Sequence, residues 1–194
     1  KGFTLDFWIN PRYDNFVQNT EFSAGTIFHM SSSIAVSLVS GSLTDERNLV
    51  SDYKMLLQLS HSADINPSNI NLSDLNASSD LIFTSSFNLK KNHWHHVSVA
   101  WDPDVNNSSG SIRIDDTVES FNIPSSSLFT RQNKIVCIGN YYDGIPDDAE
   151  KLFNSKVANA QGLTQLTSLT VEPNKQKTIF RNPLNAEVHD VKLF

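Results

Sequence analysis

Cysteine is almost absent from the sequence, whose only example is Cys137. A single cysteine cannot form an internal disulfide, so this stretch of chain must be held together by noncovalent packing and does not require an oxidising compartment. The neighbouring residues Ile135, Val136 and Ile138 are aliphatic. They predict a buried, unreactive thiol.

Long apolar runs and basic runs are also missing. No segment approaches about 18 consecutive apolar residues, so the sequence predicts no membrane-spanning helix. The 15 Lys and Arg residues are outnumbered by 21 Asp and Glu, and the net charge is −6. Nucleic acids and anionic membranes need a cationic surface, so neither is an expected partner.

Strict alternation of apolar and polar residues is the strongest positive signal. Along 93–102, Val97, Val99 and Trp101 fall on one side and His96 and Ser98 on the other, which is typical of a strand buried on one face. A turn-rich stretch follows, and alternation then resumes at 111–115. The two segments predict a β-hairpin.

Further strands follow the same pattern, separated by turn-forming residues. We expect them at 3–10, 25–30, 33–39, 53–61, 80–83, 118–123, 134–139 and 186–194. The residues between 63 and 79 are mostly Asn, Ser, Asp and Pro, which predicts a surface loop. The spacing suits an all-β, two-sheet antiparallel sandwich, and 194 residues are enough for one such domain.

Three segments resemble laminin-G-like, concanavalin A-like jelly-roll domains. Trp94 to Val99 followed by Ile112 to Asp115 resembles the W-x-H-V-A-V hairpin of that family, Phe3 to Pro11 its f-T-v-s-x-W-v-k-P strand, and Ala186 to Phe194 its closing strand. The resemblance spans the chain and implies a jelly-roll sandwich. Asp116 and Ala186 depart from the pattern, because they stand where the family has glycine. The fold carries many functions, so the resemblance alone does not choose among them.

The resemblance also implies how the domain is bounded. A family domain reaches its last strand in fewer residues, so we expect residues 141–183 to be an insertion, with a short helix at 147–153 and a hairpin at 163–171. Family domains usually begin with an additional edge strand. We therefore expect residues 1–194 to be one domain cut from a longer polypeptide.

Two groups of acidic side chains are candidate calcium ligands. Asp102 and Asp104 place carboxylates at alternating positions, and Asp143 and Asp147 lie beside Gly144 in a second oxygen-rich stretch. The alternative is that they are solvated turn residues. His93, His95 and His96 could in principle hold zinc or nickel, but we interpret them as structural because one strand face supplies only two of them.

Aromatic residues near loops are candidate ligand-binding residues. Trp8 lies opposite the apolar face of the first strand, and Tyr141 and Tyr142 stand at the start of the predicted insertion. Such rings can pack against the C–H faces of sugars. For Trp8 the alternative is packing under a loop.

Motifs for catalysis are lacking. A retaining glycosidase needs two carboxyl groups about 5 Å apart, and the E-x-D-x-x-E string of glucanases with this fold is absent, as are a nucleophile elbow, a phosphate loop and H-E-x-x-H. We therefore expect no enzyme activity. A divergent glycoside hydrolase is the alternative to a domain without catalytic activity.

The sequence thus predicts a non-catalytic recognition or adhesion module of a larger extracellular or virion protein. Its rim loops would bind a glycan or a neighbouring protein subunit, with no cofactor other than calcium. The cysteine-poor, Ser- and Asn-rich composition resembles that of jelly rolls in phage tail, fibre and capsid-decorating proteins. The alternative to a recognition module is accordingly a purely structural assembly domain of a virion, without ligand.

Overall fold

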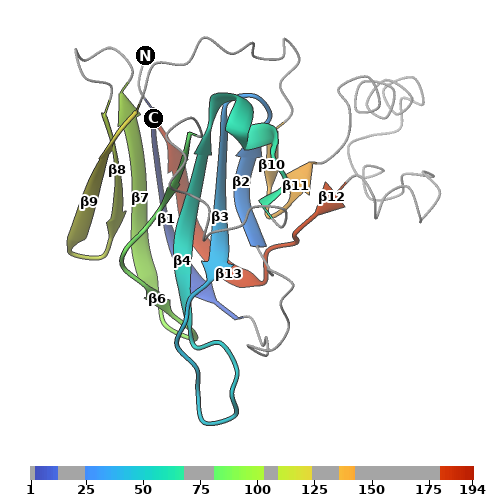
Figure 1. Ribbon diagram of the computed structural model, residues 1–194, viewed down its shortest axis with the longest axis vertical. Coiled ribbons are helices and arrows are strands. Elements are labelled where there is room, and N and C mark those ends of the chain that lie inside the picture. The colour runs from blue at the N-terminus through green and yellow to red at the C-terminus, as the bar shows by residue number, and fades with distance from the viewer. Residues whose placement is uncertain (1–2, 13–24, 68–80, 103–108, 124–135, 143–179) are drawn as a thin grey trace, which may run out of the picture.

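Two antiparallel β-sheets face each other in a computed structural model that describes residues 3–12, 25–67, 81–102, 109–123, 136–142 and 180–194 (Figure 1). The prediction of an all-β, two-sheet antiparallel sandwich is confirmed. One 3-10 helix, η1 (Ser60–Asp64), is the only helix among the described residues. None of these residues forms a helix of the length and apolarity that crossing a membrane requires.

The first sheet has five strands in the order β13-β1-β7-β8-β9. These strands are β1 (Phe3–Pro11), β7 (His95–Asp102), β8 (Ser109–Ile114), β9 (Thr117–Asn122) and β13 (Ala186–Leu193). The predicted hairpin is therefore present as β7 and β8, and the chain ends in an edge strand beside β1. Alternation decides which face each residue occupies: Leu5, Phe7 and Ile9 are fully buried.

The second sheet has six strands in the order β10-β2-β3-β4-β5, with β6 also paired to β4. These strands are β2 (Gly25–Met30), β3 (Ile34–Ser40), β4 (Asp52–Leu59), β5 (Ile82–Thr84), β6 (Leu89–Lys90) and β10 (Val136–Ile138). Nearly every residue of β2, β3 and β4 is buried. These strands form the apolar centre of the sheet.

The core lies between the sheets. Side chains of the first sheet, such as Phe7 and Val99, meet those of the second, such as Leu38, Met55 and Leu57. Burying one large apolar side chain contributes on the order of 1.5–3 kcal/mol. The noncovalent packing expected from the lack of disulfides is thus supplied by both sheets.

The prediction of a buried strand at 134–139 is wrong. Its described part, β10, is only three residues long, and Val136 and Ile138 are 56% and 68% exposed. β10 lies at the edge of its sheet, where its aliphatic residues are not covered on both sides. Cys137 is half-buried, and burial raises the pKa of its thiol, which favours the unreactive form.

The ends of the predicted insertion meet in a small ladder. β11 (Tyr141–Tyr142) pairs antiparallel with β12 (Phe180–Arg181). The helix expected at 147–153 and the hairpin expected at 163–171 lie outside the described residues. Tyr142 and Phe180, the described residues on either side of 143–179, are therefore directly paired.

Candidate ligand-binding surface

The outward face of the first sheet carries a row of aromatic rings. Because Phe7 and Ile9 point into the core, Trp8 between them points outward and is 42% exposed. Trp8 is directly opposite His189 of β13 on one side and His96 of β7 on the other. The three rings thus lie side by side across three neighbouring strands.

A second tryptophan lies beside this row. Trp94 immediately precedes β7 and is 44% exposed. Its ring meets that of His189 edge-on, with centroids 5.6 Å apart, while the rings of Trp8 and His96 are tilted, with centroids 5.1 Å apart. We call Trp8, Trp94, His96 and His189 the aromatic platform.

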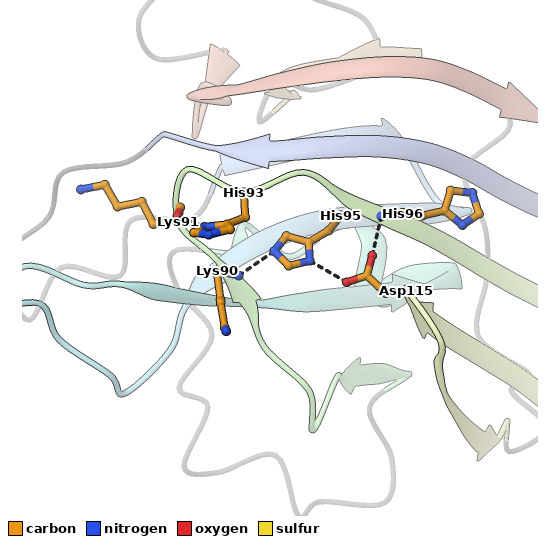
Figure 2. A network of polar contacts seen from close by, with 6 residues as sticks. All are labelled: Lys90, Lys91, His93, His95, His96 and Asp115. Carbon is orange, nitrogen blue, oxygen red and sulfur yellow. Dashed lines mark hydrogen bonds and ion pairs between the residues drawn. The ribbon is translucent and has the colours of Figure 1, made fainter.

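A hydrogen-bond network holds the loop that carries Trp94 (Figure 2). The backbone N–H of Lys90 donates to Nε2 of His95 at 2.8 Å. This ring nitrogen therefore accepts, and the ring proton is on Nδ1. From there it is donated to Oδ2 of Asp115, also at 2.8 Å, so one buried imidazole joins β6 to the turn after β8.

Asp115 is held from three directions. Its Oδ1 accepts the backbone N–H of His96 at 2.9 Å, and its own N–H donates to the carbonyl of His96 at 2.8 Å. Its φ of +53° is one that aspartate tolerates better than most residues. The turn between β8 and β9 (Figure 1) is thereby fastened to the start of β7.

The charge of Asp115 is favoured by these contacts. Desolvation is the largest single influence and raises the pKa of the carboxyl. The hydrogen bonds from His95 and from the His96 backbone, with the favourable electrostatic influence of the two histidines, together outweigh it and leave the pKa below its usual 3.8. The network thus contains an ionised acceptor, which makes its hydrogen bonds stronger than neutral ones.

The ring of His96 is itself fixed. Its Nε2–H donates to Oδ1 of Asp6 at 3.1 Å, and Asp6 shares the outward face of β1 with Trp8. The imidazole therefore cannot rotate away from Trp8 without losing a hydrogen bond. One end of the aromatic platform is held in place by this pair.

Polar groups surround the other end. Arg12 donates from Nη2 to Oε2 of Glu187 at 2.8 Å and from Nη1 to Oδ1 of Asn92 at 3.1 Å. Asn10 donates to the same Glu187 oxygen at 3.2 Å. Asn10 and Glu187 lie two residues from Trp8 and His189 on the same face. Fixed hydrogen-bonding groups therefore flank the rings.

A shallow trough continues the same surface toward the chain ends. It encloses about 460 Å³. Thr4, Ala100, Ser111 and Ser120 line it and lie in register across β1, β7, β8 and β9. Their small side chains leave space over the sheet that larger residues would fill.

The aromatic site residues predicted from the sequence differ in their exposure to solvent. Trp8 is exposed as its candidate role requires, whereas Tyr141 and Tyr142 are only 1% and 5% exposed, and Tyr141 stacks on His29 with centroids 4.2 Å apart. Stacking on a sugar needs an exposed ring face, which neither tyrosine presents.

The calcium prediction is not tested. Asp104, Asp143 and Asp147 lie outside the described residues, as does the side chain of Asp102 at the end of β7. Within the part of the chain that the structure describes, no three His, Cys, Asp or Glu side chains converge on one point. Both ring nitrogens of His95 are engaged within the protein, in keeping with a structural role.

Trp94, His189 and the polar cluster around Arg12 were not selected from the sequence. Trp94 was read only as part of the hairpin motif. His189 lies 181 residues from Trp8 in the chain, and only strand order brings the two together. The available signal was the outward parity of His189 in its strand, which becomes useful once β13 is known to pair with β1.

Comparison with known proteins does not assign the chain to a family. No protein-family model matches the chain, and no curated protein matches it. Among solved structures, the chain is similar to the native heptameric SAP-like pentraxin from Limulus polyphemus, with a TM-score of 0.47 and 13% identity over 99% of this chain and 63% of that one. The chain thus spans less than two thirds of the pentraxin's length.

Proposed function

We propose that this domain is a non-catalytic recognition module that binds glycan through the aromatic platform. The observation that carries the proposal is the pair of exposed tryptophans, Trp8 and Trp94, on one sheet face. Exposed large aromatic side chains gathered on a polar face favour a binding role over a structural one.

The chemistry of the surface suits a sugar. A pyranose ring has an apolar C–H face, which packs on an indole, and a rim of hydroxyl groups, which need donors and acceptors. Around the platform, Arg12 offers donors, while Glu187 and Asp6 offer acceptors. Small and polar residues such as Thr4, Ser111 and Ser120 line the trough on the same face.

Preorganisation supports the same proposal. His95 and Asp115 hold the loop before β7, and Asp6 holds His96. Side chains that are already fixed lose little conformational freedom when a ligand binds, so more of the interaction energy appears as affinity. The trough gives room for a ligand longer than one sugar unit.

We place the module in a larger extracellular or virion protein. In that setting a second function competes with glycan binding, because exposed tryptophans are also typical anchors of protein interfaces. The platform would then be covered by a neighbouring subunit of a virion assembly and would bind no sugar. Hydrolysis of the glycan is the less favoured third candidate, because the sequence lacks the E-x-D-x-x-E motif of glucanases with this fold.

A glycan array followed by titration tests the proposal. We expect reproducible binding by the unaltered domain and a loss of about tenfold or more in affinity for Trp8→Ala and for Trp94→Ala. Phe87→Ala is the matched control, because Phe87 is 40% exposed but lies in the turn between β5 and β6. The control should bind normally.

Two results would contradict glycan recognition at this surface. One is the absence of binding to any glycan by a folded domain. The other is binding that the Trp8 and Trp94 variants retain at full strength. Release of reducing sugar from a bound glycan would instead favour the hydrolase.

A further inference from the structure

Among the described residues, the last strand has a free edge. Within the described structure, β13 pairs only with β1, and it forms one margin of the five-stranded sheet. Val191 and Leu193 are 42% and 55% exposed there. An edge strand presents unpaired N–H and C=O groups that can accept another strand.

A β-bulge sets which way its side chains point. Glu187, His189 and Lys192 are opposite Asn10, Trp8 and Asp6, so they share the outward face. Between His189 and Lys192, β13 has one residue more than β1, and Asp190 there has a φ of +52°. Without the additional residue, Glu187 and Lys192 would face opposite sides of the sheet.

The backbone bonds to β1 show which groups face the free edge. Thr4 and Phe194 exchange two N–H···O bonds of 3.0 and 2.9 Å, and Arg12 donates to the carbonyl of Asn185 at 3.0 Å. Even-numbered residues of β1 therefore bond to β13. By the alternation of an antiparallel ladder, the backbone groups of Ala186, Val188, Val191 and Leu193 point the other way, toward the free edge.

We infer that β13 pairs antiparallel with β13 of a second copy of this chain, about a two-fold axis between His189 and Asp190. Glu187 then lies opposite Lys192 of the second copy, and His189 opposite its Asp190. Val188 lies opposite Val191 of the second copy, and Ala186 opposite its Leu193. Each acidic residue thus meets a basic side chain, and each apolar residue meets another.

The side-chain faces and the backbone bonds are both consistent with this register. Glu187 and Lys192 are both outward, so the two pairs they form with the second copy lie on one face. Val188, Val191, Ala186 and Leu193 have the backbone groups that face the free edge, so these pairs are the hydrogen-bonded ones. A two-fold interface requires such self-complementarity.

The interface adjoins the ligand-binding surface, and Glu187 and His189 belong to both. It uses the margin of the sheet, whereas the proposed ligand lies over its face, so dimerisation can be measured without any glycan. The pairing would join two five-stranded sheets into one continuous sheet, with His189 of each copy close to the axis. Two aromatic platforms would then lie on one surface.

Sedimentation velocity over a concentration series tests the inference. The unaltered domain should show reversible dimerisation. Lys192→Glu and Glu187→Lys should each weaken self-association by about tenfold, because two attractive cross-strand pairs per dimer become repulsive. Arg113→Glu is the matched control, since it makes the same kind of charge reversal on the outward face of β8, away from the edge, and should dimerise normally.

Mixing the two variants is the decisive arm. The Lys192→Glu chain carries glutamate at both positions and the Glu187→Lys chain carries lysine at both, so the mixed pair regains both attractions. We expect the mixture to dimerise about as well as the unaltered domain. Circular dichroism verifies that each variant is folded. An unaltered domain that stays monomeric, or a mixture no better than its components, would overturn the inference.

Discussion

His95 and Asp115 are joined by a 2.8 Å hydrogen bond between residues 20 positions apart in the chain. The bond links the first residue of β7 to the turn that follows β8. Because the other ring nitrogen of His95 accepts the N–H of Lys90, one side chain positions two loops. The stability of this end of the sheet and the geometry of the ligand-binding surface therefore depend on the same hydrogen bond.

Asp115→Asn should destabilise the domain by about 1–3 kcal/mol. Both carboxylate oxygens accept hydrogen bonds, one from His95 and one from the backbone of His96. Asparagine replaces one of them with a donor, which then faces another donor. Urea unfolding measures the change, and Asp116→Asn, the neighbouring exposed turn residue, should change the free energy of unfolding by less than about 0.5 kcal/mol.

The contribution of Asp115 should depend on pH. Its pKa in the folded state is below 3.8, so its ionised form stabilises the fold above the unfolded pKa. That stability is lost as pH falls through the folded pKa. The difference in unfolding free energy between the unaltered domain and Asp115→Asn should be full at neutral pH and should shrink below pH 3.8. An equal difference at both pH values would disprove this role of the charge.

Alanine substitutions at two neighbouring residues of β1 should have different effects on stability and on glycan binding. Phe7 is fully buried, and Phe7→Ala should cost about 3–5 kcal/mol of stability. Trp8 is 42% exposed, so Trp8→Ala should cost less than about 1.5 kcal/mol of stability, while its affinity for glycan should fall about tenfold or more. Chemical denaturation of both variants measures the contrast. A Trp8 variant as unstable as the Phe7 variant would show that the indole supports the fold.

Gly110 should not tolerate a side chain. A Cβ at this position would lie 2.3 Å from Cε2 of Phe121 and 3.1 Å from the carbonyl oxygen of Ala100. Gly110→Ala should therefore destabilise the domain by about 1–3 kcal/mol. Combining it with Phe121→Ala removes the nearer obstacle. In a double-mutant cycle of thermal unfolding, the double variant should lose less stability than the sum of the losses of the two single variants.

The strands were the part of the structure that local pattern could predict. Alternation along 3–10 and 93–102 identified buried and outward faces, because one face of each strand packs on the opposite sheet. The run 134–139 was misjudged for a related reason. An apolar run looks the same at the centre and at the margin of a sheet, and only strand order shows that Val136 and Ile138 are at the margin.

The surface was less predictable than the strands. Trp8 could be found from its parity within one strand. Trp94 and His189 join it through pairings between distant segments, and Asp115 joins His95 through a turn whose conformation rests on a positive φ. Tyr141 and Tyr142 sit in a loop-like sequence but are buried against the second sheet, where Tyr142 donates its N–H to His29. Tertiary contacts decided these positions.

The short ladder between β11 and β12 has a consequence for how the domain can vary. Tyr141 and Tyr142 lie directly across from Arg181 and Phe180, so the chain between them begins and ends on a closed stem. The entropy needed to close such a stem rises only slowly with the number of residues it spans. Evolution or engineering can therefore exchange the intervening stretch for one of another length, and the sandwich keeps its register.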